Sequence, residues 1–149
     1  MINNKLLNQL IMKNLSETTE LAQKLIIKKS VTPNDDGAIK VLKKKLSKIG
    51  FKNIDLPFGS KRNNDLILNL FSINKSKKLN NKTLCFAGHT DVVPEGDCKK
   101  WKYDPFLGKV SGGKLHGRGA SDMKGAIAAW IMACDNILRK KKLNISLAL

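Results

Sequence analysis

The chain reads, from residue 83, Thr83-Leu84-Cys85-Phe86-Ala87-Gly88-His89-Thr90-Asp91-Val92-Val93-Pro94. The first five of these residues carry no charge, which predicts a buried strand over residues 83–87. Residues two apart on extended backbone point the same way, so Asp91 can accept a hydrogen bond from the His89 ring nitrogen that faces away from a metal. A histidine that caps a strand end beside a turn aspartate gives the same pattern. The spacing alone leaves both interpretations open.

A glycine-rich stretch follows, Gly117-Arg118-Gly119-Ala120-Ser121-Asp122-Met123-Lys124-Gly125. Its glycines favour irregular backbone that bends around a site. Asp122 is therefore a candidate bridging ligand, because two divalent ions can share one carboxylate and one water. The same aspartate also suits the N-cap of a following helix, and that role does not exclude metal binding.

Hydrophobic periodicity predicts an α/β architecture around these two motifs. Helices are expected over residues 17–29, 35–49 and 126–138, and strands over residues 66–73, 83–87 and 143–149. In such folds, ligands gather at the carboxyl ends of strands. We expect Lys43-Lys44-Lys45 to form the solvated side of the second helix. The third helix is apolar on almost every side, so we expect other elements to cover it.

Composition and charge narrow the class of protein. At 149 residues the chain fits one domain, and it has no run of about 18 or more apolar residues, so no membrane span is expected. The net charge of +16 is typical of nucleic-acid binders, but only Arg62, Arg118 and Arg139 of the 28 basic residues are arginine. Proteins that bind bases and phosphates favour the bidentate arginine fork. We therefore expect no nucleic-acid partner, and a positive potential that attracts a small anionic substrate.

Cysteine usage and the first residues bear on the compartment. Cys85, Cys98 and Cys134 are odd in number and form no Cys-x-x-Cys pair, which opposes a disulfide framework or a thiolate zinc site. Cys85 and Cys134 lie in apolar runs, so we expect buried thiols. The N-terminus lacks the apolar core and cleavage site of a signal peptide. These features predict a cytoplasmic protein.

Together the two motifs resemble those of the zinc-dependent aminoacylase and desuccinylase superfamily of co-catalytic metallopeptidases. The resemblance rests on residues 89–97, Trp101, Pro105-Phe106 and residues 117–125, with further matches at residues 30–33 and 49–51. It runs from about Glu20 to Leu149 and is nearest to the desuccinylases. It implies the N-terminal portion of a zinc-peptidase-like catalytic domain over residues 15–149, with a mixed sheet flanked by helices. An N-terminal extension occupies residues 1–14.

The resemblance also implies roles for individual residues. His89 would ligate one metal, Asp122 would bridge both, and Asp91 would be the catalytic aspartate that positions His89. The cofactor would be two zinc ions, with cobalt able to substitute. The intact enzyme, a homodimer, would hydrolyse N-succinyl-LL-2,6-diaminopimelate to succinate and LL-2,6-diaminopimelate in lysine biosynthesis. The peptide bond between Asp122 and Met123 is expected to be cis.

Several positions depart from the pattern of the family. Glu95 stands where relatives often have a second proline, and His116 stands where they often have tyrosine, so we expect a structural role for His116. No glutamate follows Asp122, and the general base and remaining metal ligands of the family would lie outside the chain. We therefore expect the chain alone to be an inactive fragment. Acetylornithine deacetylase, aminoacylase or a non-catalytic binding module remain alternatives.

Overall fold

The computed structural model describes residues 16–63, 65–76, 82–140 and 146–149. The expected N-terminal extension over residues 1–14 lies outside them. In the part of the chain so described, no helix is both long and apolar enough to cross a membrane. The first described element is a helix over residues 16–26, which ends before the lysine pair Lys28-Lys29 that was expected to close it.

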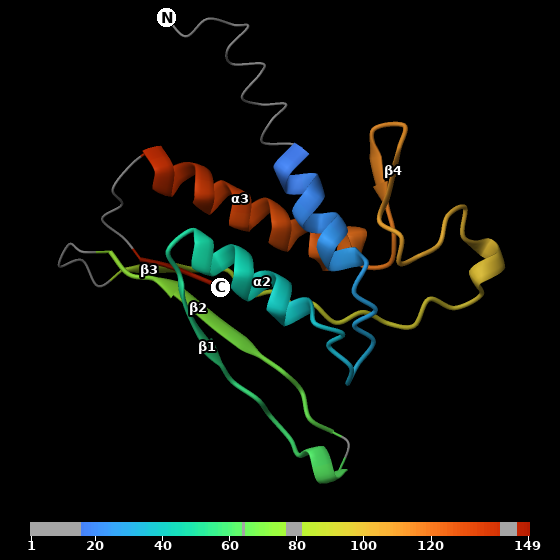
Figure 1. The fold of residues 1–149 in the computed structure, drawn as a ribbon, viewed down its shortest axis with the longest axis horizontal. Helices are drawn as coiled ribbons and strands as arrows, with labels where there is room; N and C mark the ends of the chain where they lie inside the picture. Colours follow the sequence, from blue (N-terminus) through green and yellow to red (C-terminus); the bar gives the residue numbers. More distant parts are fainter. Residues whose placement is uncertain (1–15, 64, 77–81, 141–145) are drawn as a thin grey trace, which may run out of the picture.

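Eleven further elements follow in the described chain, with the strands β1 to β5 between the helices α2 and α3 and the strand β6 at the end (Figure 1). They are α2 (Ala38–Lys48), β1 (Lys52–Asp55), η1 (Lys61–Asn63), β2 (Leu70–Asn74), β3 (Thr83–Cys85), η2 (Cys98–Lys100), β4 (Lys109–Ser111), β5 (Lys114–His116), η3 (Ala120–Lys124), α3 (Gly125–Lys140) and β6 (Ser146–Ala148). The ends of α2 follow from its sequence. Asp35 Oδ1 accepts a hydrogen bond from the Ile39 amide at 3.0 Å, and Gly50 adopts a φ of 87° just beyond the helix.

The four-stranded sheet has the order β1-β2-β6-β3 and is mixed. β2 pairs antiparallel with β1 and with β6, whereas β3 and β6 run parallel, with Cys85 opposite Ala148. β4 and β5 form a separate antiparallel hairpin. This arrangement confirms the predicted mixed sheet with flanking helices. It also brings the carboxyl ends of β3 and β6 to the same edge of the sheet.

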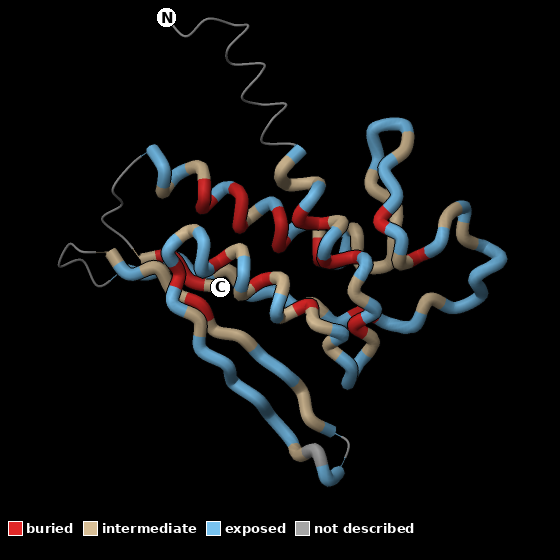
Figure 2. The backbone as a smooth tube through the Cα atoms, viewed as in Figure 1, coloured by how far each residue is buried: buried red, intermediate tan, exposed pale blue. Residues whose placement is uncertain are grey.

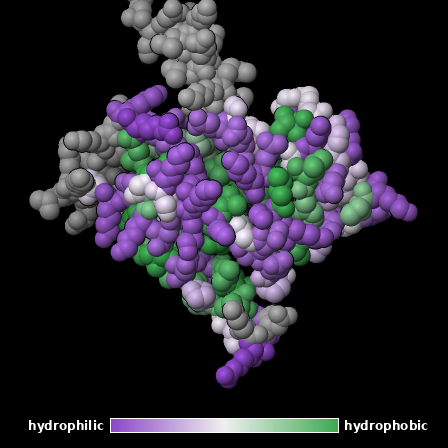
Figure 3. Space-filling model, in the orientation of Figure 1, coloured by the Kyte–Doolittle hydropathy of each residue, from purple (hydrophilic) through white to green (hydrophobic). Residues whose placement is uncertain are grey.

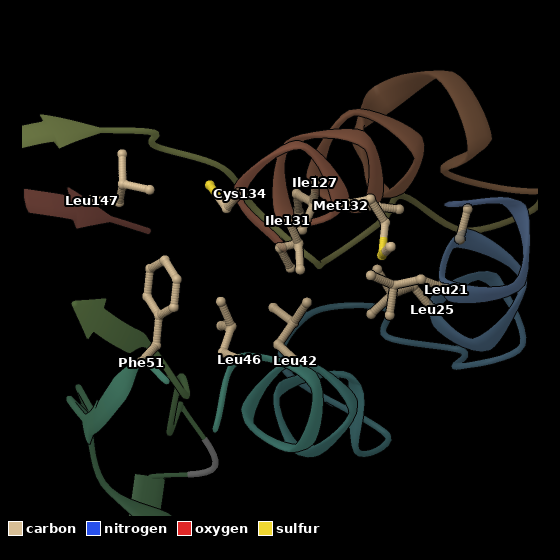
Figure 4. Close-up of a cluster of buried hydrophobic side chains, with 12 residues drawn as sticks. Leu21, Leu25, Leu42, Leu46, Phe51, Ile127, Ile131, Met132, Cys134 and Leu147 are labelled. Carbon is tan, nitrogen blue, oxygen red and sulfur yellow. The ribbon is translucent and has the colours of Figure 1, made fainter. Parts of the chain in front are cut away.

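The hydrophobic core lies between the helices and one face of the sheet. Its buried members are Leu21, Ala22, Leu25, Leu42, Leu46, Phe51, Ile127, Ala128, Ile131, Met132, Cys134 and Leu147. Figure 4 shows Leu42 and Leu46 from α2 pointing toward Ile131 from α3, with Phe51 and Leu147 at the sheet end. Figure 2 shows the buried residues concentrated in α2, α3 and the neighbouring sheet. The two segments that extend β1 and β2 away from the sheet, residues 56–60 and 65–69, are mostly exposed.

Two strand predictions need correction. The strand expected over residues 66–73 begins only at Leu70, because Ile67 makes no more than an isolated bridge with Phe58. The expected buried strand at residues 83–87 is β3, which is shorter and exposed, with Leu84 55% accessible. β3 has β6 as its only partner in the described sheet, so its side chains lack cover. The Cys85 thiol is consequently exposed rather than buried.

The predicted third helix is confirmed as α3, but only one of its faces is covered. Ile131 is fully buried, whereas Ile137 is 43% exposed, and Ala129 and Ala133 are exposed on the same outer side. The described residues therefore do not supply the cover that is expected for the outer face of this helix. Cys134 does lie inside as predicted, and burial raises the pKa of its thiol to about 11.

A buried carboxylate links α3 to α2. Asp135 accepts hydrogen bonds from Lys45 Nζ and from Arg139 Nε, each at 2.6 Å, while its own side chain is only 4% exposed. Hydrophilic residues do cover much of the outer region of α2 in Figure 3. The expectation that Lys45 is solvated is nevertheless wrong. Its side chain reaches a carboxylate on a neighbouring helix, and the spacing of residues in the sequence does not reveal such a contact.

Asp135→Asn is expected to lower the free energy of unfolding by about 1–2 kcal/mol at neutral pH, since two cations lose a buried partner but retain access to water. Burial alone would raise the pKa of Asp135, but hydrogen bonds from Arg139 and Lys45 outweigh it and hold the pKa below its usual value. The contribution is thus present above the ordinary aspartate pKa and is lost as pH falls through the lower folded-state value. Urea denaturation from pH 7 to pH 3 measures it. An unchanged acid dependence in the variant would contradict this assignment.

Candidate metal centre

His89 lies four residues beyond Cys85, the last paired residue of β3, where the chain leaves the sheet edge. Its Nδ1 lies 3.0 Å from the Asp91 carbonyl oxygen and 3.1 Å from Asp91 Oδ1. In the tautomer with its proton on Nδ1, the ring would donate to these oxygens and would keep the Nε2 lone pair for a metal. The structure thus has the His89–Asp91 geometry that the two-residue spacing predicted.

Asp122 approaches the other side of the same ring. Its Oδ1 lies 3.1 Å from His89 Nε2, although the two residues are 33 positions apart. Asp122 has extended backbone, with φ −127° and ψ 101°, inside the turn η3 that leads into α3. The peptide bond to Met123 is cis, as expected. The Asp122 side chain is 85% exposed, so it can reach a ligand that enters from solvent.

The donor atoms fit a divalent metal ion. Two ligands of one tetrahedral zinc, with bonds of about 2.0–2.2 Å, lie about 3.3–3.6 Å apart, slightly more than the 3.1 Å between Nε2 of His89 and Oδ1 of Asp122. Within the described residues, no group of three or more histidine, cysteine or acidic side chains is clustered to hold a metal. The described chain therefore offers a pair of ligands, fewer than the three that a catalytic zinc usually has.

Two depressions meet at the His89 ring. One, of about 520 Å³, is lined by His89 and Asp91 together with Thr32, Phe86 and Leu149. The other, of about 370 Å³, is lined by His89 and Asp122 together with Trp101 and Arg118. His89 stands at the boundary between them, so a small molecule bound in either depression would lie beside its ring.

Charges around the ring favour its protonated form when no metal is present. Burial opposes that charge, but interactions with Asp91 and Asp122 outweigh the burial and raise the pKa of His89 above its ordinary value. Lys124, two residues after Asp122, is fully buried and its Nζ donates to the Lys28 carbonyl at 2.7 Å. Burial lowers the pKa of Lys124 to about 8.

The loop after Asp91 is held by groups that the sequence did not single out for this purpose. Arg118 Nη2 donates to the carbonyls of Pro94 and Glu95 at 3.2 and 3.3 Å, and its guanidinium lies 5.0 Å from the Trp101 ring centre. Trp101 Nε1 donates to the same Glu95 carbonyl at 2.9 Å, and the Glu95 carboxylate accepts from Lys29 Nζ at 2.5 Å. Glu95 thus supplies a cross-link that a proline cannot.

His116 takes no part in this cluster. It lies in β5, its ring packs edge-on against Tyr103 with centres 5.0 Å apart, and its Nε2 lies 3.4 Å from the Ser111 carbonyl oxygen. The structure therefore supports the structural role expected for it.

Comparison with known proteins places these motifs in a family. The model of peptidase family M20/M25/M40 matches residues 85–149, which include His89, Asp91 and Asp122. Residues 85–149 are therefore similar to the peptidases of this family. The M20 match confirms the resemblance drawn from the two motifs.

Individual relatives match a longer part of the chain than the family model does, and this part reaches further toward the N-terminus. The chain is 45% identical to a succinyl-diaminopimelate desuccinylase of Hahella chejuensis over 127 residues, which cover 85% of this chain and 31% of that protein. It is 48% identical to the enzyme of the same name from Ehrlichia chaffeensis over 120 residues, 78% of this chain and 29% of that protein. The chain thus spans less than a third of the length of these curated relatives.

Two solved structures share the fold of this chain. Human carnosine dipeptidase 1 matches with a TM-score of 0.80 at 24% identity, over 94% of this chain and 32% of that one. The M20 family metallo-carboxypeptidase Sso-CP2 from Sulfolobus solfataricus matches with a TM-score of 0.74 at 23% identity, over 89% and 30%. These matches confirm the predicted fold, a mixed sheet flanked by helices.

Gly119→Ala tests how tightly η3 is held against the His89 loop. Gly119 has a φ of 81°, and an added Cβ would lie 2.7 Å from Val92 Cγ1. We expect a loss of about 1–3 kcal/mol in the free energy of unfolding, from the strained backbone and the overpacked contact. Gly96→Ala is the control, because Gly96 has a φ of 72° but nothing within 4 Å of an added Cβ. Equal losses in the two variants, measured by urea denaturation, would show that the contact with Val92 is unimportant.

Proposed function

We propose that this chain is the N-terminal part of the catalytic domain of a metal-dependent amide hydrolase, whose intact form cleaves N-succinyl-LL-2,6-diaminopimelate to succinate and LL-2,6-diaminopimelate. The observation that carries the proposal is the approach of His89 Nε2 to Asp122 Oδ1 at 3.1 Å, with Asp91 on the opposite ring nitrogen. The desuccinylase relatives, at 42–48% identity, support the choice of substrate.

Each of the three residues has a distinct task in this proposal. His89 and Asp122 would hold the metal, zinc or in its place cobalt, with Asp122 shared between two ions. Asp91 would orient the His89 ring and increase its basicity through Nδ1. A divalent metal supplies, when bound, a Lewis acid that polarises the scissile carbonyl. The reaction consumes one water, whose oxygen ends in the succinate carboxylate while the released amine takes a proton.

The sheet supports a location for the remaining ligands and the general base, which the family resemblance assigns to residues after Leu149. β6 runs parallel to β3, with Cys85 opposite Ala148. A chain that continues in this register would advance beside Phe86 and His89, and Leu149 already lines the same depression as His89. Carboxylates a few residues further on would therefore reach the metal centre. The proposal for the whole protein depends on such a continuation.

The proposal also covers partners and compartment. The intact enzyme is proposed to be a cytoplasmic homodimer that acts on a small anionic substrate and binds neither nucleic acid nor membrane. The net charge of +16 supports attraction of a polyanionic substrate over long range. No transmembrane helix is found among the described residues.

The decisive experiment uses a longer protein that continues beyond Leu149 to the length of the relatives. It is loaded with zinc or cobalt and assayed with N-succinyl-LL-2,6-diaminopimelate, N-acetylornithine and N-acetyl amino acids. We expect the succinylated substrate to be preferred and chelation of the metal to abolish turnover. Preference for an acetylated substrate would assign the protein to another deacylase of the superfamily. Absence of hydrolysis of every substrate would contradict the enzyme proposal.

A further inference from the structure

Thr32 contacts the carboxylate that orients His89. Its Oγ1 donates a hydrogen bond to Asp91 Oδ2 at 2.8 Å, across 59 residues of sequence. The other oxygen, Oδ1, lies 3.1 Å from His89 Nδ1. Each oxygen of the Asp91 carboxylate thus has its own partner, a hydroxyl at Oδ2 and the imidazole ring at Oδ1.

The backbone around Thr32 is itself fixed against the His89 loop. Ser30 is buried, its Oγ donates to the Thr90 carbonyl at 2.6 Å, and its own carbonyl accepts from the Val92 amide at 2.9 Å. Val31 and Val92 form an isolated parallel bridge. Thr32 therefore does not reach Asp91 from a freely moving loop, because the preceding two residues are paired with the residues on both sides of Asp91.

The Asp122 segment attaches to the same place. Lys124 Nζ donates to the Lys28 carbonyl at 2.7 Å, four residues before Thr32. The segment Lys28–Thr32 is therefore bonded both to the loop that carries His89 and to the turn that carries Asp122. Its contacts connect the two parts of the chain whose side chains meet at Nε2 of His89.

We propose that Thr32 is a positioning residue of the metal centre, which holds the Asp91 carboxylate so that Oδ1 accepts the Nδ1 proton of His89. The consequence concerns the tautomer of the neutral ring. Asp122 stands at Nε2 and Asp91 at Nδ1, so the two carboxylates compete for one proton. A fixed Asp91 keeps the proton on Nδ1 and the lone pair on Nε2. The inference rests on the proposed function only in taking His89 as a metal ligand.

The chain contains only two histidines, which makes the test direct. The ring nitrogen shifts of ¹⁵N-histidine-labelled, metal-free chain are recorded at a pH where the rings are neutral, for wild type, Thr32→Val and Thr32→Ser. The valine variant keeps the shape of threonine without its hydroxyl, whereas the serine variant keeps the hydroxyl. We expect the difference between the two His89 nitrogen shifts to shrink in Thr32→Val, as the proton becomes shared with Nε2. It should be retained in Thr32→Ser, and His116 should not change in either variant.

A second measurement follows the consequence for metal binding. Zinc affinity of the longer protein, measured by competition with a chelator, is expected to fall about three- to tenfold in Thr32→Val, less than the roughly 10–100-fold typical of losing the histidine's own partner. Unchanged His89 shifts in Thr32→Val would overturn the proposal. So would equal changes in Thr32→Val and Thr32→Ser, because the methyl group rather than the hydroxyl would then be responsible.

Two features of the design allow the role of Thr32 to be tested even if a variant unfolds or the longer protein is inactive. Should thermal melting show that Thr32→Val is largely unfolded, Thr32→Ala is judged against Thr32→Ser by the same criteria. The nitrogen shifts are measured without metal or substrate, so they do not depend on whether the extended protein hydrolyses an amide. Failure of the positioning role and failure of the desuccinylase proposal therefore give different results.

Discussion

His89→Ala is expected to lower zinc affinity by more than about a hundredfold, because losing a ligand exceeds the roughly 10–100-fold that losing its outer partner usually costs. The removed ring supplies the only nitrogen of the His89–Asp122 pair, and alanine leaves the Asp122 carboxylate without its 3.1 Å neighbour. Hydrolysis by the longer protein should fall below detection for the same reason. Zinc competition with a chelator and turnover of the succinylated substrate are the two measurements.

His116→Ala is the matched control for this variant. It removes the other histidine of the chain, whose ring packs against Tyr103 in the hairpin β4–β5. Its zinc affinity should stay within about threefold of wild type, since exposed or peripheral substitutions rarely change a distant site. Zinc affinity that survives in His89→Ala, or that falls equally in His116→Ala, would remove His89 from the proposed metal centre.

Ile131→Ala is expected to destabilise the chain by about 2–5 kcal/mol, the usual result of truncating a buried isoleucine and leaving a cavity. Ile131 is fully buried at the centre of α3, in the core shared with α2 and the helix over residues 16–26. Small domains have total stabilities of about 5–15 kcal/mol, so the variant should lose a large part of its stability. Urea denaturation gives the change as a shift in midpoint at constant slope.

Ile137→Ala serves as the control on the same helix. Ile137 is 43% exposed on the outer face of α3, so its truncation should change the free energy of unfolding by less than about 1 kcal/mol. A loss in Ile137→Ala as large as that in Ile131→Ala would mean that the outer face of α3 is covered in solution. Comparing the two variants therefore tests whether only the inner face of α3 is buried, as in the structure, or whether its outer face is covered as well.

The three proposed site residues could be identified from sequence because their chemistry and spacing are local. His89 and Asp91 are two residues apart at the end of a strand, and extended backbone places them on one side. Asp122 was identified through its glycine-rich surroundings and the family pattern. The 3.1 Å approach of Asp122 to His89 could not be derived in this way, because it depends on how η3 folds back over the end of β3.

Burial was predicted less well than the order of elements. Cys85 and Leu84 are apolar and lie in an apolar run, yet they are exposed because β3 has one strand partner in the described sheet. Lys45 stands in a run of three lysines, yet it pairs with the buried Asp135 of α3. Hydropathy reports the preference of a residue, whereas burial depends on which neighbours the fold supplies.

The amino-acid sequence by itself determined the α/β class, the positions of the main helices, the family resemblance and the residues His89, Asp91 and Asp122. Each follows from periodicity or from groups of residues close together in the chain. Only the tertiary structure decided the contact of Thr32 with Asp91 and of Lys124 with the Lys28 carbonyl. These bonds join residues 59 and 96 positions apart, and no local pattern encodes them because they form only once strands and helices have packed.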